Sequence, residues 1–222
     1  MGIVTGYICL TLLFLLLIKF LARRFKWTKI DRTLMKFHKY IAFSFLLVAI
    51  VHFILVLKVL AGRHLVITIS GIIILVTGLL LTTVCHLLKD RKVEIKFHRA
   101  FSMIMAIMLL LHLVVNIADF NAYGKAIDAI DIKEVDLMEV ADGTYFGEYD
   151  AGFVYAKVSV TVADHKITEV KLLKHITERG KPAEVIINSM VDENRIDVDS
   201  VSSATNSSLV IQQACVNALI GK

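Results

Sequence analysis

Four histidines restrict how the first half of this chain can fold. His38 and His52 are 14 positions apart, and His98 and His112 repeat that spacing 60 positions later, within a repeated Lys-Phe-His context. In an α-helix, 14 residues fall roughly 40° short of four full turns, so both members of a pair share one helix face. At about 1.5 Å of rise per residue, the two rings of a pair stand about 21 Å apart along the helix axis.

Long apolar segments surround these histidines. Four of them are long enough to cross a hydrocarbon core about 30 Å thick. They are Ile3–Ala22, Tyr40–Leu60, Leu65–Leu88 and His98–Ala118. The first lacks a basic start and has its charges after the apolar run, so it is predicted to be a retained helix and not a signal peptide. The sequence therefore predicts a bundle of four transmembrane helices over residues 1–120.

Charge is divided unevenly along the chain. Residues 1–122 contain 15 Lys and Arg against 4 Asp and Glu, whereas residues 123–222 contain 10 against 16. The two loops that join the first helix to the second and the third to the fourth hold 12 of the basic residues. Because basic loops stay in the cytoplasm, both chain ends and the acidic second half are predicted to be extracytoplasmic. The expected location is the plasma (inner) membrane of a prokaryote.

The second and fourth helices then run in the same direction, which brings His38 level with His98 and His52 level with His112. Two neutral imidazoles can occupy both axial positions of a haem iron, and ionisable residues at membrane depth are usually functional. We therefore predict two b-type haems, with these four histidines as iron ligands. A histidine that only hydrogen-bonds a backbone carbonyl, or one copied by an internal duplication, is the alternative. Candidate contacts for the inner haem propionates are Lys36, Lys39, Lys96 and Arg99, and those for the outer haem are Lys58, Arg63 or His64.

The remaining histidines and the cysteines have no partners at useful spacing. Structural roles are expected for His64, His86, His165 and His175, and no disulfide framework is expected from Cys9, Cys85 and Cys215. The sequence has no glycine-rich dinucleotide fingerprint, P-loop or nucleic-acid motif. The chain is therefore not expected to oxidise NAD(P)H by itself or to bind nucleic acid.

After a linker at 121–136, or a short helix there, the pattern changes to that of a small α+β domain over residues 137–222. Val154–Val162 alternates as a half-buried strand, Ala163–Lys166 is a turn, and Ile167–His175 is a second strand that completes a hairpin. Pro182 opens a helix at about 182–193, and a last helix at about 207–220 is capped by Gly221. Asp142-Gly143 and Gly147 are predicted to mark turns.

On the histidine spacing and topology, residues 1–120 resemble four-helix di-haem cytochrome b and ferric-reductase-like transmembrane domains. The second half carries a sharper motif, Asp199-Ser200-Val201-Ser202-Ser203-Ala204-Thr205. It resembles the flavinylation motif of the covalent FMN-binding domains found in Na+-translocating NADH:quinone reductases and in Rnf-type electron-transport complexes. Asp199, Ser202, Ala204 and Thr205 match that motif, and Ser203 stands where glycine is more common.

The resemblance implies FMN bound to Thr205 through a phosphoester bond that a dedicated flavin transferase installs. A phosphate on Thr205 would lie at a helix N-terminus, where backbone N–H groups favour an anion. The alternative is a polar loop that only caps the helix, a role that Ser207 or Ser208 also suits.

These observations together predict a membrane electron conduit. Electrons would enter on the cytoplasmic side from quinol or a partner flavoprotein, pass both haems, reach FMN and leave to an external acceptor. The reverse direction is also open. A haem-free membrane anchor for a flavin domain that serves a partner redox complex is one alternative, and a redox sensor is another.

Overall fold

The computed structural model describes residues 2–221; the side chains at positions 61 and 84–86, which include that of His86, lie outside the described part. Within these residues the chain forms two compact units. The first combines residues 2–60 with 64–116, and the second combines residues 61–63 with 117–221. Each unit has its own buried core.

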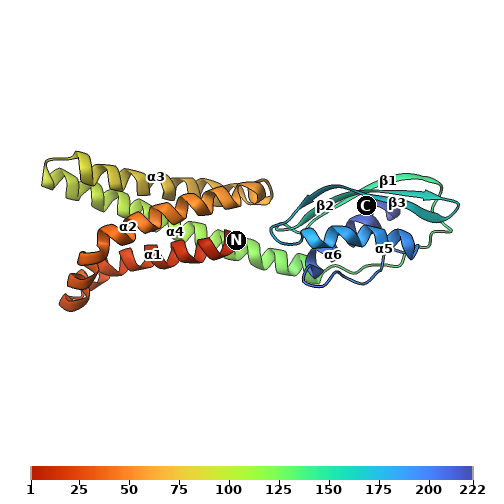
Figure 1. Cartoon of the computed structure of the whole chain (residues 1–222), viewed down its shortest axis with the longest axis horizontal. Helices are drawn as coiled ribbons and strands as arrows, with labels where there is room; N and C mark the ends of the chain where they lie inside the picture. Colours follow the sequence, from red (N-terminus) through yellow and green to blue (C-terminus); the bar gives the residue numbers. More distant parts are fainter. Residues whose placement is uncertain (1, 222) are drawn as a thin grey trace. The chain divides into compact units, whose positions relative to one another are not determined.

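The first unit consists of α-helices (Figure 1). They are α1 (Gly2–Arg24), α2 (Thr28–Val56), α3 (Leu65–Leu87) and the first part of α4 (Arg91–Asp128), with the 3-10 helix η1 (Leu57–Gly62) after α2. Each predicted apolar segment is thus helical. Helix α4 is longer than predicted and includes residues 121–128, because Tyr123, Ala126 and Ile127 pack against the core of the second unit.

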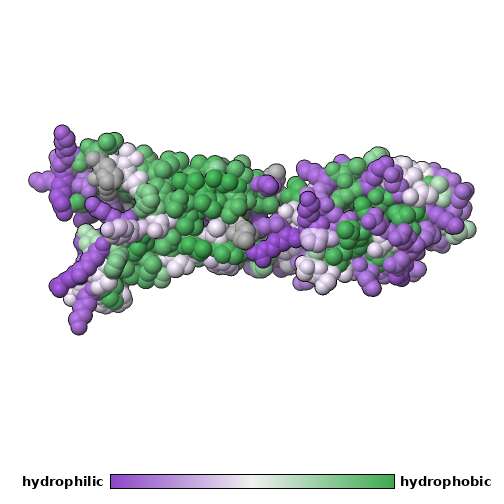
Figure 2. Space-filling view, viewed as in Figure 1, coloured by the Kyte–Doolittle hydropathy of each residue, from purple (hydrophilic) through white to green (hydrophobic). Residues whose placement is uncertain are grey.

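Four side chains, one from each of the long helices, form the centre of this bundle. They are Leu13 of α1, Phe45 of α2, Ile74 of α3 and Met105 of α4, and all are buried. Many other apolar side chains, among them Phe43 and Leu110, face outward, and Figure 2 shows an almost continuous hydrophobic surface over these helices. All four helices are long and apolar enough to cross a membrane, as the sequence predicts for a membrane protein.

The second unit contains a three-stranded antiparallel sheet in the order β1-β2-β3. The strands are β1 (Gly143–Asp150), β2 (Tyr155–Ala163) and β3 (Lys166–Ile176). The predicted hairpin of β2 and β3 is confirmed. Its turn has positive φ at Asp164 (51°) and His165 (59°), which is the backbone of a type I′ turn suited to the twist of a hairpin.

The prediction of turns at Asp142-Gly143 and Gly147 is wrong, because residues 143–150 form strand β1. Gly147 lies inside this strand at a point where α6 packs against it. A Cβ atom at position 147 would stand 2.3 Å from the Ala214 carbonyl oxygen. Glycine is therefore required there for close approach of two backbones, and not for a turn.

Helices cover one face of the sheet (Figure 1). They are the 3-10 helix η2 (Lys181–Val185), α5 (Ile186–Asp192) and α6 (Thr205–Ile220). The alternating residues of β2 that were predicted to face inward, Val158 and Val160 among them, are fully buried against these helices. Helix α6 begins two residues earlier than predicted, and Gly221 caps its end with φ of 69°, as expected. The fold of this unit is thus the small α+β domain predicted from the sequence.

Candidate functional site

Thr205 is the first residue of α6, and its side chain is exposed. The residue before it, Ala204, has an extended φ of −134° and makes no side-chain capping hydrogen bond. The first N–H groups of a helix have no partners within the helix, and the helix dipole adds partial positive charge at this end. The Thr205 hydroxyl therefore stands where a phosphate attached to it would be stabilised.

The two alternative serines of this helix are buried. Ser207 Oγ lies 3.4 Å from Thr177 Oγ1, and a Cβ atom on Gly180 would overlap with the Ser207 side chain. Ser208 Oγ accepts a hydrogen bond from Val201 N at 3.0 Å and donates one to the Ala204 carbonyl. Ser208, and not Thr205, thus ties the preceding loop to the helix. These contacts give Ser207 and Ser208 structural roles and leave the Thr205 hydroxyl accessible.

Ser203 has φ of +65°, in the left-handed region that favours glycine. The chain needs this conformation to turn from the loop into α6. The motif commonly has glycine at this position, and the backbone conformation there favours glycine. Serine adopts the same conformation with strain. Asp199 and Ser202 lie exposed in the same loop, and Ala204 is buried.

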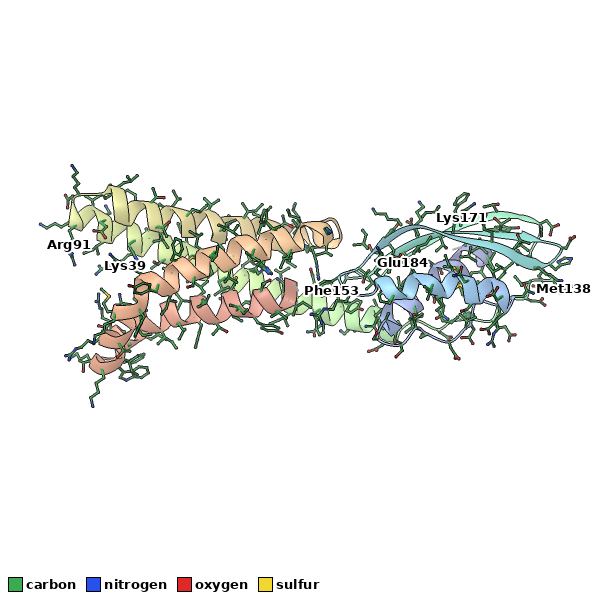
Figure 3. The ribbon with its side chains drawn as sticks, viewed as in Figure 1. Lys39, Arg91, Met138, Phe153, Lys171 and Glu184 are labelled. Carbon is green, nitrogen blue, oxygen red and sulfur yellow. The ribbon has the colours of Figure 1, made fainter. Side chains whose placement is uncertain are left out.

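Two aromatic side chains that the sequence analysis did not single out lie beside this helix start. Asn206 Nδ2 donates a hydrogen bond to Tyr123 Oη at 2.8 Å, and the Tyr123 ring stacks on that of Phe153, which Figure 3 labels, at 5.2 Å between centroids. No sequence motif marks them, because Tyr123 comes from the end of α4 and Phe153 from the loop before β2. Their rings give the region around Thr205 an apolar, aromatic side.

In the first unit, the rings of His38 and His98 are neighbours and are tilted to each other, with 6.0 Å between their centroids and 37° between their planes. A metal bound by one nitrogen of each ring at about 2 Å would hold the two centroids about 6 Å apart. Helices α2 and α4 thus bring together the predicted inner pair at a separation that fits an iron ion with two axial imidazoles.

The predicted basic residues near this pair are all exposed, including Lys39, which is labelled in Figure 3. A different lysine is close. Lys19 of α1 lies near enough to both His38 and His98 for its charge to act on each ring. Sequence analysis did not select Lys19, although a lysine five residues before the end of an apolar helix is a signal that a polar group faces the bundle interior.

The outer histidines are held by matching contacts. His52 Nδ1 lies 3.0 Å from the Gly2 carbonyl oxygen and 3.1 Å from Thr5 Oγ1 of α1. His112 Nδ1 lies 3.2 Å from the Ile67 carbonyl oxygen and 3.0 Å from Ser70 Oγ of α3.

These contacts define which ring nitrogen carries the proton. Thr5 Oγ1 donates its hydrogen to the Gly2 carbonyl, and Ser70 Oγ donates its hydrogen to the carbonyls of Val66 and Ile67. A carbonyl oxygen can only accept, so the Nδ1 within hydrogen-bond distance of the Gly2 or Ile67 carbonyl carries the hydrogen, and the hydroxyl oxygen beside it accepts as well. Nδ1 of each ring is therefore the donor, which leaves Nε2 as the nitrogen with a lone pair for a metal.

The inner pair is thus compatible with one iron by its ring separation, and each ring of the outer pair donates from Nδ1 to a neighbouring helix. His52 and His112 are also close enough to interact electrostatically. Thr5-Gly6 and Ser70-Gly71 were missed by sequence analysis. The signal was a hydroxyl residue followed by glycine in each helix that precedes a histidine-bearing helix, although Thr77-Gly78 of α3 is the same pair and has no histidine contact within the described residues.

The histidines expected to be structural have local partners. His64 Nδ1 accepts from Val66 N at 3.4 Å, and His165 Nδ1 lies 3.2 Å from the Leu137 carbonyl. His175 Nδ1 lies 3.0 Å from Glu184 Oε1 (Figure 3 labels Glu184). His86 has no described side chain.

Comparison with known proteins adds one match. Residues 152–220 match the family of FMN-binding domains. The matched segment runs from the loop before β2 to the last residue of α6, so Thr205 lies within it. No curated protein and no solved structure matches the chain. The match supports FMN as the cofactor of the second unit and flavin-based electron transfer as its chemistry.

Proposed function

We propose that this protein carries electrons across a prokaryotic plasma membrane, between a cytoplasmic-side donor such as quinol or a flavoprotein and an external acceptor. The observation that carries the proposal is one chain with both an FMN-binding segment and a bundle of four apolar helices, in which α2 and α4 bring His38 beside His98. Haem iron and a flavin supply the redox chemistry when bound. The chain supplies ligands, spacing and an apolar environment.

In this proposal His38 and His98 ligate one haem b, and His52 and His112 ligate the second. Lys19 replaces the predicted Lys36, Lys39, Lys96 and Arg99 as the strongest candidate for holding an inner haem propionate, because its charge acts on both inner rings. Phe45 of α2 and Met105 of α4, each midway in sequence between the two histidines of its helix, are buried in the apolar core of the bundle, which provides an apolar space between the pairs.

Thr205 forms a phosphoester with FMN, installed by a flavin transferase, and the start of α6 stabilises the phosphate. The buried states of Ser207 and Ser208 favour Thr205 over both as the site of attachment. An attached flavin would stay with a domain that faces the outside of the cell, where a dissociating FMN is lost.

The absorption spectrum of the purified full-length protein, co-expressed with a flavin transferase, tests this function. We expect a haem Soret band, together with flavin fluorescence that survives denaturation and an FMN adduct in the intact mass. Flavin without a Soret band would favour the haem-free anchor. Haem and flavin without sustained turnover would favour the redox sensor.

Matched variants assign the residues. Thr205→Ala is expected to abolish the covalent flavin and leave both haems, whereas Thr205→Ser retains part of it. An adduct that maps to Ser207 or Ser208 would contradict the assignment. His52→Ala or His112→Ala is expected to remove the outer haem and leave much of the inner one, with His165→Ala as the control.

A reporter fused to the C-terminus tests the direction in which the chain crosses the membrane. The 12 Lys and Arg of the two basic loops predict that a reporter that folds only outside the cytoplasm will be active. A fusion that is active only in the cytoplasm would show that electrons reach FMN on the inner side.

A further inference from the structure

Helices α1 and α3 present the same three groups to the outer histidines. Each supplies a backbone carbonyl, a hydroxyl three residues later and a glycine immediately after the hydroxyl. In α1 these are Gly2, Thr5 and Gly6, which contact His52; in α3 they are Ile67, Ser70 and Gly71, which contact His112. We refer to each set as a clamp.

The glycine allows the ring to approach the clamp helix. A Cβ atom on Gly6 would stand 3.2 Å from His52 Cε1, and one on Gly71 would stand 3.4 Å from His112 Cε1. At Gly6 a side chain would press the imidazole away from the carbonyl and the hydroxyl, whereas at Gly71 a Cβ atom would only reach ordinary van der Waals contact. The ring is thus fixed in position and in tautomer by one face of a neighbouring helix.

The inner histidines lack this arrangement. His98 Nδ1 lies 3.3 Å from Ser102 Oγ, which is on its own helix. Within the described residues, neither inner ring has a hydrogen bond to a neighbouring helix. The clamps are therefore a property of the outer site.

We propose that Thr5 and Ser70 are positioning residues that hold the outer histidines as Nε2 ligands and lower the reduction potential of the iron bound there. A histidine whose Nδ1–H donates to strong acceptors becomes more basic at Nε2, and a more basic ligand favours the oxidised metal. This inference rests on the proposed function, because it requires haem between His52 and His112.

The two hydroxyls contribute unequally. For His112 the hydroxyl contact (3.0 Å) is shorter than the carbonyl contact (3.2 Å), whereas for His52 the order is reversed, at 3.1 Å and 3.0 Å. Loss of the Ser70 hydroxyl therefore removes the shorter acceptor of its pair, and loss of the Thr5 hydroxyl removes the longer one. Ser70→Ala should have the larger effect.

Helix α3 contains a matched control. Thr77 is buried and donates its hydroxyl hydrogen to the carbonyls of Ile73 and Ile74, as Ser70 does with Val66 and Ile67, and it has no histidine contact within the described residues. Thr77→Val therefore removes a buried, back-bonded hydroxyl from the same helix without touching the ligand. In α1, Thr11→Val is the control for Thr5→Val.

The test is a redox titration of the two haems in purified full-length protein, followed by absorbance. Ser70→Ala is expected to raise the midpoint potential of the outer haem and leave that of the inner haem unchanged. A tenfold change in the ratio of oxidised to reduced haem equals about 59 mV for one electron, and a shift of that order is expected. Thr5→Val should give a smaller rise, Ser70→Thr should restore the wild-type value, and both control variants should leave both potentials unchanged.

Two results would overturn the inference, and they are distinguishable. If the wild type binds the outer haem and Ser70→Ala leaves the midpoint potential of that haem unchanged, the clamp is refuted and the proposed function stands. A wild type without an outer haem, seen in its spectrum before any titration, would refute both. If Ser70→Ala loses the outer haem while Thr77→Val and Ser70→Thr retain it, the clamp is supported as a positioning device.

Discussion

The two units of this chain use apolar side chains in opposite ways. In α4 of the first unit, Leu110 is 65% exposed, whereas Val210 of α6 in the second unit is fully buried. Both units bury some polar groups, Ser70 and Thr77 in the helical unit and Ser207 and Ser208 in the other, but the candidate attachment residue of the second unit, Thr205, is exposed. Lipid stabilises apolar side chains on the outside of a bundle and water does not, so the difference is the one expected if the first unit spans a membrane.

The comparison also indicates where function lies in each unit. When the exterior is apolar, the chemically specific groups are those kept inside, and here they surround the paired histidines. When the interior is apolar, the specific groups lie at the surface, and here they are at the start of α6. The candidate site of the first unit is thus in its interior, and that of the second unit is at its surface. In each unit this is the part that need not be apolar.

The largest expected effect is a loss of stability of the second unit, caused by a substitution in its closely packed interior. Gly147→Ala places a Cβ atom 2.3 Å from the Ala214 carbonyl oxygen, so α6 must move away from β1. We expect a loss of about 3 kcal/mol or more in the free energy of unfolding. Limited proteolysis of the second unit across a urea series measures it.

Gly124→Ala is the control for this substitution. A Cβ atom at Gly124 meets nothing within 4 Å, and the position is helical. It should leave stability unchanged or raise it by about 0.5–1 kcal/mol. Equal losses in both variants would show that the second unit is not closely packed at Gly147.

The next effect tests the outer surface of the first unit. Leu110→Lys places a charge near the middle of the apolar part of α4, at an expected cost of about 3 kcal/mol for membrane insertion. Phe146→Lys changes a side chain of β1 that is exposed to the same degree (65%) in the water-facing unit, and should cost less than about 0.5 kcal/mol. The amount of each variant in the membrane fraction, compared with wild type, measures the difference.

A smaller effect is expected at the turn before α6. Ser203 has φ of +65°, so Ser203→Gly should relieve strain and stabilise the second unit by about 1 kcal/mol. Ser202→Gly, in the same exposed loop without positive φ, should stabilise nothing. Thermal unfolding followed by flavin fluorescence measures the stability of both variants. Equal changes in unfolding temperature would contradict the conformational explanation for glycine in the motif.

Much of this architecture was predictable from periodicity. The apolar runs indicate the four helices, and the alternation from Val154 to Val162 indicates the hairpin, because both patterns reflect a single face of burial. Strand β1 is not predictable in this way, because its glycines resemble turn signals, although Gly147 serves a long-range contact with α6. Sequence spacing cannot reveal such a contact between residues about 70 positions apart.

For the sites, the ligand candidates were predictable and their surroundings were not. The four histidines stood out by spacing, and Thr205 stood out by its motif. Lys19, Thr5 and Ser70 act on histidines of other helices, so their relation depends on how the helices pack. The burial of Ser207 and Ser208, which favours Thr205, likewise follows from tertiary contacts.

The smallest effect at neutral pH concerns two cysteines that are protected for different reasons. Burial raises the pKa of the Cys215 thiol to about 12, so the folded second unit keeps it protonated while an unfolded chain ionises it from about pH 9. Between these pH values the free energy of unfolding of the second unit should fall as pH rises, and Cys215→Ala should remove that pH dependence.

Cys9 is only partly buried in α1, and lipid, not packing, should shield it. In membranes of a Cys85→Ser variant at pH 8, urea is therefore expected to make Cys215 reactive towards a maleimide and leave Cys9 protected. Simultaneous labelling of Cys9 and Cys215 would show that the two units unfold together, which would contradict their division into separate compact units.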